Sequence, residues 1–223
     1  MTSPSLVHAP EQEKVKPRLR GVSHVFGFVA AVGGFCFLAM SPAQGLQYVA
    51  GLVYGGGLML MFGLSGLYHR PMWTLRARAV LRRFDHVGIF FLIAGTFTPV
   101  ATVYAHGRWS GWLTLLWSAA VFGMVFMVVF SHAHRALRAA VYVVMGLLGA
   151  PVIFGLPGLI GWGLVGLLLL GAAVYIFGAT VYARRWPNPN PAIFGYHEFF
   201  HIMVIIAAAL HFAAVLQLQY RFA

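Results

Sequence analysis

The sequence predicts an all-α integral membrane protein built as a bundle of seven transmembrane helices. Hydrophobic residues make up 61% of the 223 positions and charged residues only 9%, whereas a soluble domain has about 25% charged residues. Apolar runs recur at about 20 residues, the length with which a helix crosses a bilayer, and the alternation of barrel strands over about 10 residues is missing. Cationic residues also gather in alternate loops, as they do in multi-pass membrane proteins.

Seven apolar runs, separated by short segments rich in Gly and Pro, define the expected helices. They cover residues 22–41, 46–67, 86–105, 112–130, 137–155, 159–182 and 197–218. Residues 1–20 are expected to form a polar, basic cytoplasmic tail and residues 21–223 the transmembrane domain. Pro99 and Pro151 fall inside expected helices and predict kinks there.

The distribution of positive charge predicts the orientation in the membrane. Thirteen of the fifteen Lys and Arg residues fall in the tail and in the loops after the second, fourth and sixth expected helices. The positive-inside rule therefore places the N-terminus in the cytoplasm and the C-terminus outside, in the inner (plasma) membrane of a cell. This topology also explains the formal charge of +11, so no nucleic-acid partner is expected.

Polar side chains from three distant helices are expected at one membrane depth, near the cytoplasmic side. Ionisable residues inside a membrane are costly, so each is a hypothesis for a functional site. The residues are Ser65 and His69 at the end of the second helix, Asp85 and His86 at the start of the third, and H-E-F-F-H at 197–201 at the start of the seventh.

The spacing of these residues favours a zinc site. Residues four apart on a helix differ by about 40° and about 6 Å, so His197 and His201 share a face and can bind one Zn²⁺. His69 is the natural third ligand, which leaves the fourth tetrahedral position for water. Asp85 could hold that water or orient a ligand, and Ser65 could hydrogen-bond nearby. Zinc would lower the pKa of the water towards about 7.

Glu198 has two interpretations. H-E-x-x-H is also a metalloprotease motif in which the Glu is the general base. However, Glu198 is about 100° around the helix from His197, and it could instead complement the positive end of the helix dipole. His24 and His211 are interpreted as packed, hydrogen-bonding residues outside the site.

Five stretches resemble one known family. They are S-H-V-F-G at 23–27, S-G-L-Y-H at 65–69, R-R-F-D-H-V-G-I-F-F-L-I-A-G-T-F-T-P at 82–99, F-G-Y-H-E-F-F-H at 194–201 and A-L-H-F at 209–212. In them the chain resembles the haemolysin-III-like proteins of the progestin and adipoQ receptor family. The resemblance spans essentially all seven helices, with one departure: P-R-L-R-G stands at 17–21, where bacterial members often carry acids.

The resemblance implies a zinc ion held by His69, His197 and His201, with Asp85 in contact with a zinc-bound water. It also implies similarity to membrane hydrolases that cleave amide bonds in lipids, including ceramidase-like members. Pore formation, which the family's name suggests, finds no support in the sequence, because no amphipathic pore-forming segment is present.

Four hypotheses for function follow. The first is a zinc-dependent intramembrane hydrolase that cleaves an amide or ester bond of a membrane lipid, releases free fatty acid and serves lipid homeostasis, with Asp85 moving the proton. The second is a non-enzymatic receptor or regulator in which zinc clamps the second, third and seventh helices together. The third is an intramembrane metalloprotease, and the fourth is a haem cytochrome using paired histidines. A retinal pump is excluded, because the only lysines, Lys14 and Lys16, lie in the tail.

Overall fold

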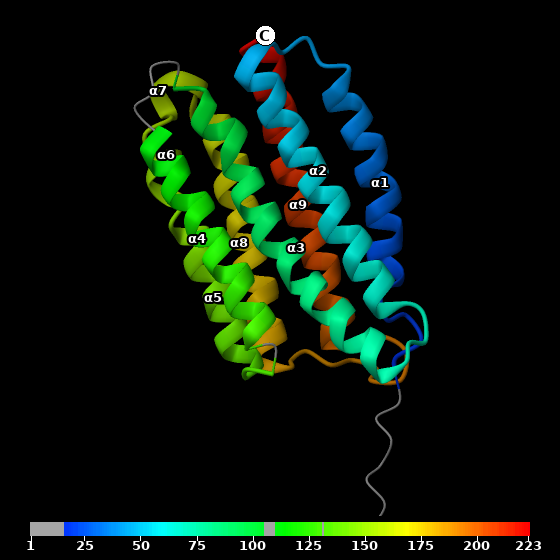
Figure 1. The fold of residues 1–223 in the computed structure, drawn as a ribbon. Coiled ribbons are helices and arrows are strands. Elements are labelled where there is room, and N and C mark those ends of the chain that lie inside the picture. Colours follow the sequence, from blue (N-terminus) through cyan, green and yellow to red (C-terminus); the bar gives the residue numbers. More distant parts are fainter. Residues whose placement is uncertain (1–15, 105–109, 131) are drawn as a thin grey trace, which may run out of the picture.

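The protein is a bundle of long helices that run roughly side by side (Figure 1). The computed structural model describes residues 16–104, 110–130 and 132–223. Within these ranges seven helices are long and apolar enough to cross a membrane, and no β-strand forms. The predicted fold class is therefore confirmed. Most of the predicted tail, residues 1–15, and the loop residues 105–109 lie outside the described part of the chain.

The described helices follow one another with short connections. They are α1 (Val22–Ala39), α2 (Gly45–His69), α3 (Leu75–Thr102), α4 (Ser110–Val129), α5 (Arg135–Leu147), α6 (Ala150–Phe154), α7 (Pro157–Ile160), α8 (Trp162–Arg184) and α9 (Tyr196–Arg221). The short helix α6 continues α5 as one membrane span, Arg135–Phe154. The predicted seventh helix is thus α9.

The predicted start of the third helix was wrong. α3 begins at Leu75 and not at residue 86, because an arginine-rich stretch continues the helix beyond its apolar part. Thr74 caps this extension by accepting a hydrogen bond from the N–H of Ala77 at 3.3 Å. Asp85 consequently lies about three turns inside α3 and does not open the helix as predicted.

The predicted fifth helix is interrupted near Pro151. α5 ends at Leu147 and α6 starts at Ala150, because a proline has no N–H to donate to the carbonyl four residues earlier. Gly149, between the two helices, lies against the ring of Phe97: a Cβ at this position would come within 1.8 Å of Phe97 Cζ. Pro99, by contrast, lies inside α3, which continues to Thr102.

α3 and α9 lie at the centre of the bundle. On one side, α1 and α2 pack against α9 around buried residues that include Tyr54, Met61 and Phe62. On the other side, α4 and α5 pack against α3, and α8 packs against α9 and α5, around buried residues that include Phe90, Phe97 and Leu168. Of the membrane-spanning stretch of α3, 67% is buried, but only 22% of that of α1. α1 therefore lies at the edge of the bundle.

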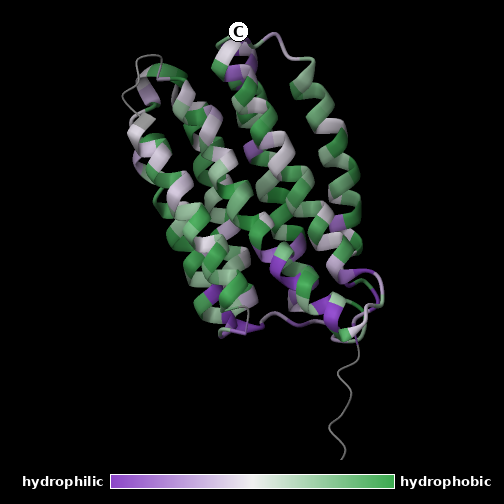
Figure 2. Cartoon of the chain, in the orientation of Figure 1, coloured by the Kyte–Doolittle hydropathy of each residue, from purple (hydrophilic) through white to green (hydrophobic). Residues whose placement is uncertain are grey.

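Hydrophilic residues gather at one end of the bundle, where the described chain starts and where α2, α4 and α8 end (Figure 2). We call this the basic end. The middle of the bundle is mainly hydrophobic, as a membrane-embedded protein requires. That the basic end faces the cytoplasm remains a prediction from the positive-inside rule.

The contact between Gly149 and Phe97 generates the first prediction. We expect Gly149→Ala to lower the free energy of unfolding by about 1–3 kcal/mol, because the added methyl group overpacks a buried aromatic ring. Gly146→Ala is the matched control, since a Cβ there meets nothing within 4 Å and alanine favours the helix. Thermal unfolding in detergent measures both. A Gly149→Ala protein as stable as the Gly146→Ala protein would contradict the described packing.

Candidate metal centre

Three histidines from two helices meet near the basic end. His69 is the last residue of α2, and His197 and His201 lie on one face of the first two turns of α9. The Nε2 atoms of His69 and His197 are 3.3 Å apart. Each of the three side chains offers a nitrogen within 4.8 Å of those of the other two. The structure thus brings together the three residues that the sequence analysis named as ligands.

The donor set fits a zinc ion. A tetrahedral zinc with Zn–N distances of about 2.0–2.1 Å separates two ligand nitrogens by about 3.3 Å, which is the distance between the Nε2 atoms of His69 and His197. The same two atoms are at hydrogen-bonding distance from each other. A divalent cation that prefers nitrogen ligands would replace this contact and bind all three rings.

Asp85 and Ser65 lie beside the three histidines. Asp85 is 8% exposed, and its Oδ2 atom is 3.8 Å from Nε2 of His69, beyond the length of a hydrogen bond. Ser65, one turn before His69 on α2, is buried and interacts with the Asp85 carboxylate. The structure therefore also brings these two predicted residues to the centre, with α3 supplying the acid.

His24 is a functional candidate that the sequence analysis placed outside the site. Its ring stacks on that of His201, with centroids 3.7 Å apart and ring planes 9° apart. Its Nδ1 atom lies 2.8 Å from Oγ of Ser65. One feature of the sequence could have indicated this role: His24 lies near the predicted cytoplasmic end of the first expected helix, at the same depth as the other polar residues. His211 instead pairs with the carbonyl of Leu168 at 3.0 Å, as expected of a packed residue.

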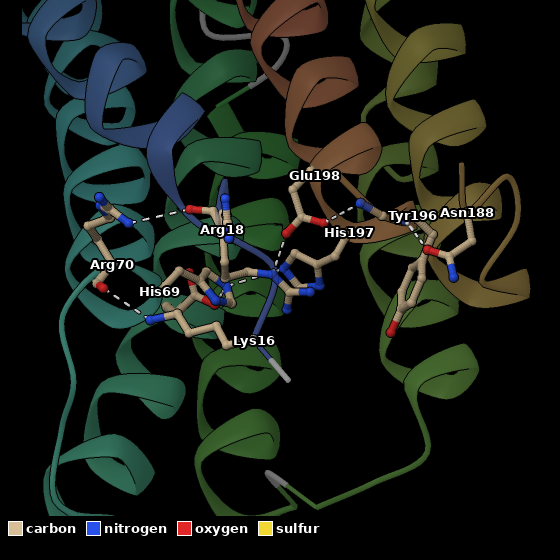
Figure 3. A network of polar contacts seen from close by, with 11 residues as sticks. Lys16, Arg18, His69, Arg70, Asn188, Tyr196, His197 and Glu198 are labelled. Carbon is tan, nitrogen blue, oxygen red and sulfur yellow. Dashed lines mark hydrogen bonds and ion pairs between the residues drawn. The ribbon is translucent and has the colours of Figure 1, made fainter. Parts of the chain in front are cut away.

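The carboxylate of Glu198 is engaged away from the three histidines (Figure 3). Its Oε2 atom accepts a hydrogen bond from the N–H of Gly195 at 2.8 Å, which caps the start of α9. Its Oε1 atom forms an ion pair with Arg20. This arrangement favours a role for Glu198 at the start of α9 over a role as general base. It also ties the N-terminal segment to the helix that carries His197 and His201.

Residues 16–21, which we call the covering segment, lie against the basic end of the centre. The N–H groups of Arg18 and Leu19 donate to the carbonyls of Ala192 and Ile193 at 3.0 and 3.1 Å. Gly21 has a φ of 78° and approaches His69 so closely that a Cβ would come within 2.6 Å of the Cβ of His69. A residue other than glycine would be strained here both by its backbone and by this contact.

A lysine completes the attachment of the covering segment. Nζ of Lys16 donates to the carbonyls of Arg70 and Pro71 at 3.0 and 3.3 Å (Figure 3). Partial burial and the nearby cations Arg78, Arg70 and Arg20 lower the pKa of Lys16. The segment thus joins the end of α2 to the loop before α9 from outside the membrane spans.

Fold and site together define a multi-pass membrane protein with a three-histidine centre near one end of its helix bundle. A model of the family described as haemolysin-III related matches residues 12–212. The chain belongs to this family.

Three relatives illustrate the breadth of the similarity. The chain is 29% identical over 219 residues to progestin and adipoQ receptor-like protein 1 of Caenorhabditis elegans, a match that covers 89% of the chain and 50% of that protein. It is 28% identical over 214 residues to the adiponectin receptor protein of Drosophila melanogaster, a match that covers 86% of the chain and 48% of that protein. It is 27% identical over 201 residues to hemolysin-3 of Bacillus cereus, a match that covers 87% of the chain and 88% of that protein. The chain therefore spans about half the length of the two animal relatives.

The centre generates a prediction about metal content. We expect the protein, purified in detergent without added metal, to hold close to one zinc per chain, and His197→Ala to lose it because one of three donors is gone. Asp85→Ala should keep the zinc, because the carboxylate is not one of the three donors. Elemental mass spectrometry measures the content, with His211→Ala as the control for loss of a buried histidine. Loss of zinc from Asp85→Ala as well would make the carboxylate a ligand.

The contacts of Glu198 generate a second prediction here. We expect Glu198→Gln to lower the free energy of unfolding by about 1–3 kcal/mol, because Arg20 loses a charged partner while the amide oxygen still accepts from Gly195. Zinc content should stay unchanged. Thermal unfolding of Arg20→Gln, Glu198→Gln and the double variant isolates the coupling between the two side chains. A folded Glu198→Gln protein that has lost its zinc would show a direct role of Glu198 in the centre.

Proposed function

We propose that the protein is a zinc-dependent intramembrane hydrolase that cleaves an amide or ester bond of a membrane lipid and releases a free fatty acid. The observation that carries this proposal is the three-histidine group with Asp85 next to it. Catalytic zinc sites use three protein ligands and keep one position for water, whereas structural sites use four. Lipid substrates suit a centre that lies within an apolar helix bundle.

His69, His197 and His201 would hold the zinc ion, which when bound supplies a Lewis acid and lowers the pKa of a water molecule. Asp85 accepts the proton of the attacking water and returns it to the departing amine or alcohol. Ser65 holds the Asp85 carboxylate in place from the neighbouring helix. The surrounding apolar side chains exclude bulk water, which strengthens electrostatic interactions in the centre.

A second function, a receptor or regulator in which the metal clamps α2, α3 and α9 together, is supported by a different observation. Two relatives carry the names of an adiponectin receptor and a progestin and adipoQ receptor-like protein. In that case the metal would serve stability, and Asp85 would have no chemical role. The metalloprotease alternative is less well supported, because its general base, Glu198, is paired with Arg20 and Gly195.

The hydrolase proposal predicts zinc-dependent release of fatty acid. Purified protein in lipid nanodiscs should release fatty acid from at least one member of a panel of ceramides, other N-acyl lipids and glycerolipid esters. Asp85→Asn should lower the rate by about 10²-fold or more, the usual contribution of a general base, while zinc stays bound. His132→Ala, at an exposed histidine of the basic end, is the control and should retain full activity.

Two results would contradict the hydrolase proposal. One is zinc-loaded protein that releases no fatty acid from any lipid of the panel. The other is an Asp85→Asn protein with unchanged activity. The first result, together with thermal unfolding that shifts when zinc is removed, would favour the receptor or regulator.

A further inference from the structure

We propose that His24 is a positioning residue of the metal centre: its ring holds the imidazole of His201 in place, so that α1 controls the geometry of the site. The inference rests on the proposed metal binding of His69, His197 and His201, but not on hydrolysis. Its evidence is the set of contacts that His24 makes on three sides.

The first contact is the stack on His201. Two rings with centroids 3.7 Å apart and planes 9° apart lie face to face over most of their area. His24 and His201 are each only 2% exposed, so the stack lies inside the bundle. A flat ring in this position blocks rotation of the His201 imidazole about its Cβ–Cγ bond, because that rotation would tilt the ring into His24.

The need for such a contact follows from how metal-ligating histidines are normally held. The second ring nitrogen of a ligating histidine usually donates to a carboxylate, a carbonyl or water, which fixes the ring. Nδ1 of His201 has no hydrogen-bond partner among the described residues. Among those residues, therefore, no hydrogen bond fixes the ring through Nδ1. The flat face of His24 restrains the ring from one side, beside the T-shaped contacts of His69 and His197.

The second and third contacts hold His24 itself. Nδ1 of His24 pairs with Oγ of Ser65 at 2.8 Å, and Ser65 in turn interacts with Asp85. The Phe62 ring packs against His24 in a T-shaped arrangement, with centroids 5.1 Å apart. Ser65 and Phe62 both belong to α2, so the helix that ends in His69 also sets the position of the ring that supports His201.

α1 and α2 approach closely at this depth. A Cβ on Gly27, about one turn after His24, would come within 2.8 Å of the Phe62 ring. Gly66 on α2 faces the backbone of Val25 in the same way, because a Cβ added to Gly66 would lie 3.4 Å from the backbone nitrogen of Val25. These close contacts leave little room for α1 to slide, so His24 stays level with His201.

The test compares two apolar substitutions that differ in whether they offer a flat ring. His24→Phe keeps a ring against His201, whereas His24→Leu fills similar space without one. His211→Leu is the matched control, because His211 is equally a buried histidine of the bundle but pairs with Leu168. Each protein is stripped of metal and titrated with Co²⁺, whose visible absorption reports the coordination geometry, and Kd is taken from the titration.

We expect His24→Leu to weaken Co²⁺ binding by about 10–100-fold, the usual cost of losing a group that orients a ligand, and to change the absorption bands at saturating cobalt. His24→Phe should recover most of the affinity and keep bands of the wild-type form. His211→Leu should match the wild type. Because the bands are recorded at saturation, a loss of general stability alone does not change them.

Two outcomes would overturn the inference: wild-type affinity and absorption in His24→Leu, or equal losses in His24→Leu and His24→Phe. Wild-type protein that takes up no cobalt would overturn it together with the metal centre. Wild-type protein that binds cobalt but hydrolyses no lipid would remove the hydrolase alone, and the comparison of the two substitutions would still decide the role of His24.

Discussion

Three imidazole groups lie in contact with one another inside an apolar helix bundle, and this arrangement sets the main constraint on the structure. Buried polar nitrogens are costly unless they share a partner. The Nε2 atoms of His69 and His197 are only 3.3 Å apart, so the two helices that carry them must be held at a fixed distance and orientation. A cation would satisfy the nitrogens, but it would bind well only if the rings are already in place.

Much of the chain near the basic end serves to hold these two helices. Glu198 caps α9 through Gly195 and pairs with Arg20, so the segment before α1 is fixed to the start of α9. Gly88 of α3 lies against the backbone of α2, where a Cβ would come within 3.1 Å of Cα of Met61. This close approach of α3 to α2 brings Asp85 to within 3.8 Å of His69. The edge helix α1 completes the centre from the remaining side.

Hydropathy and spacing were sufficient to predict the bundle and the meeting of His69, His197 and Asp85, because both follow from which end of each span a residue occupies. The start of α3 could not be predicted in this way, since hydropathy reports where the membrane begins and not where the helix begins. The role of His24 depends on a ring stack between α1 and α9, which no periodicity reveals. The direction in which the Glu198 side chain points could not be predicted either, because the sequence does not show that Arg20 folds back onto the start of α9.

The covering segment has a consequence for the kinetics of metal exchange. A chelator arriving from the basic end meets residues 16–21 before it meets the histidines, and the side chain of His69 is only 10% exposed. For a metal ion held by the three histidines, removal by this route would require local opening, in which the backbone hydrogen bonds of Arg18 and Leu19 break along with the pairing of Arg20. The residence time of such an ion would then be set by how often this short segment detaches, and it could change while the equilibrium affinity of the histidines stays the same.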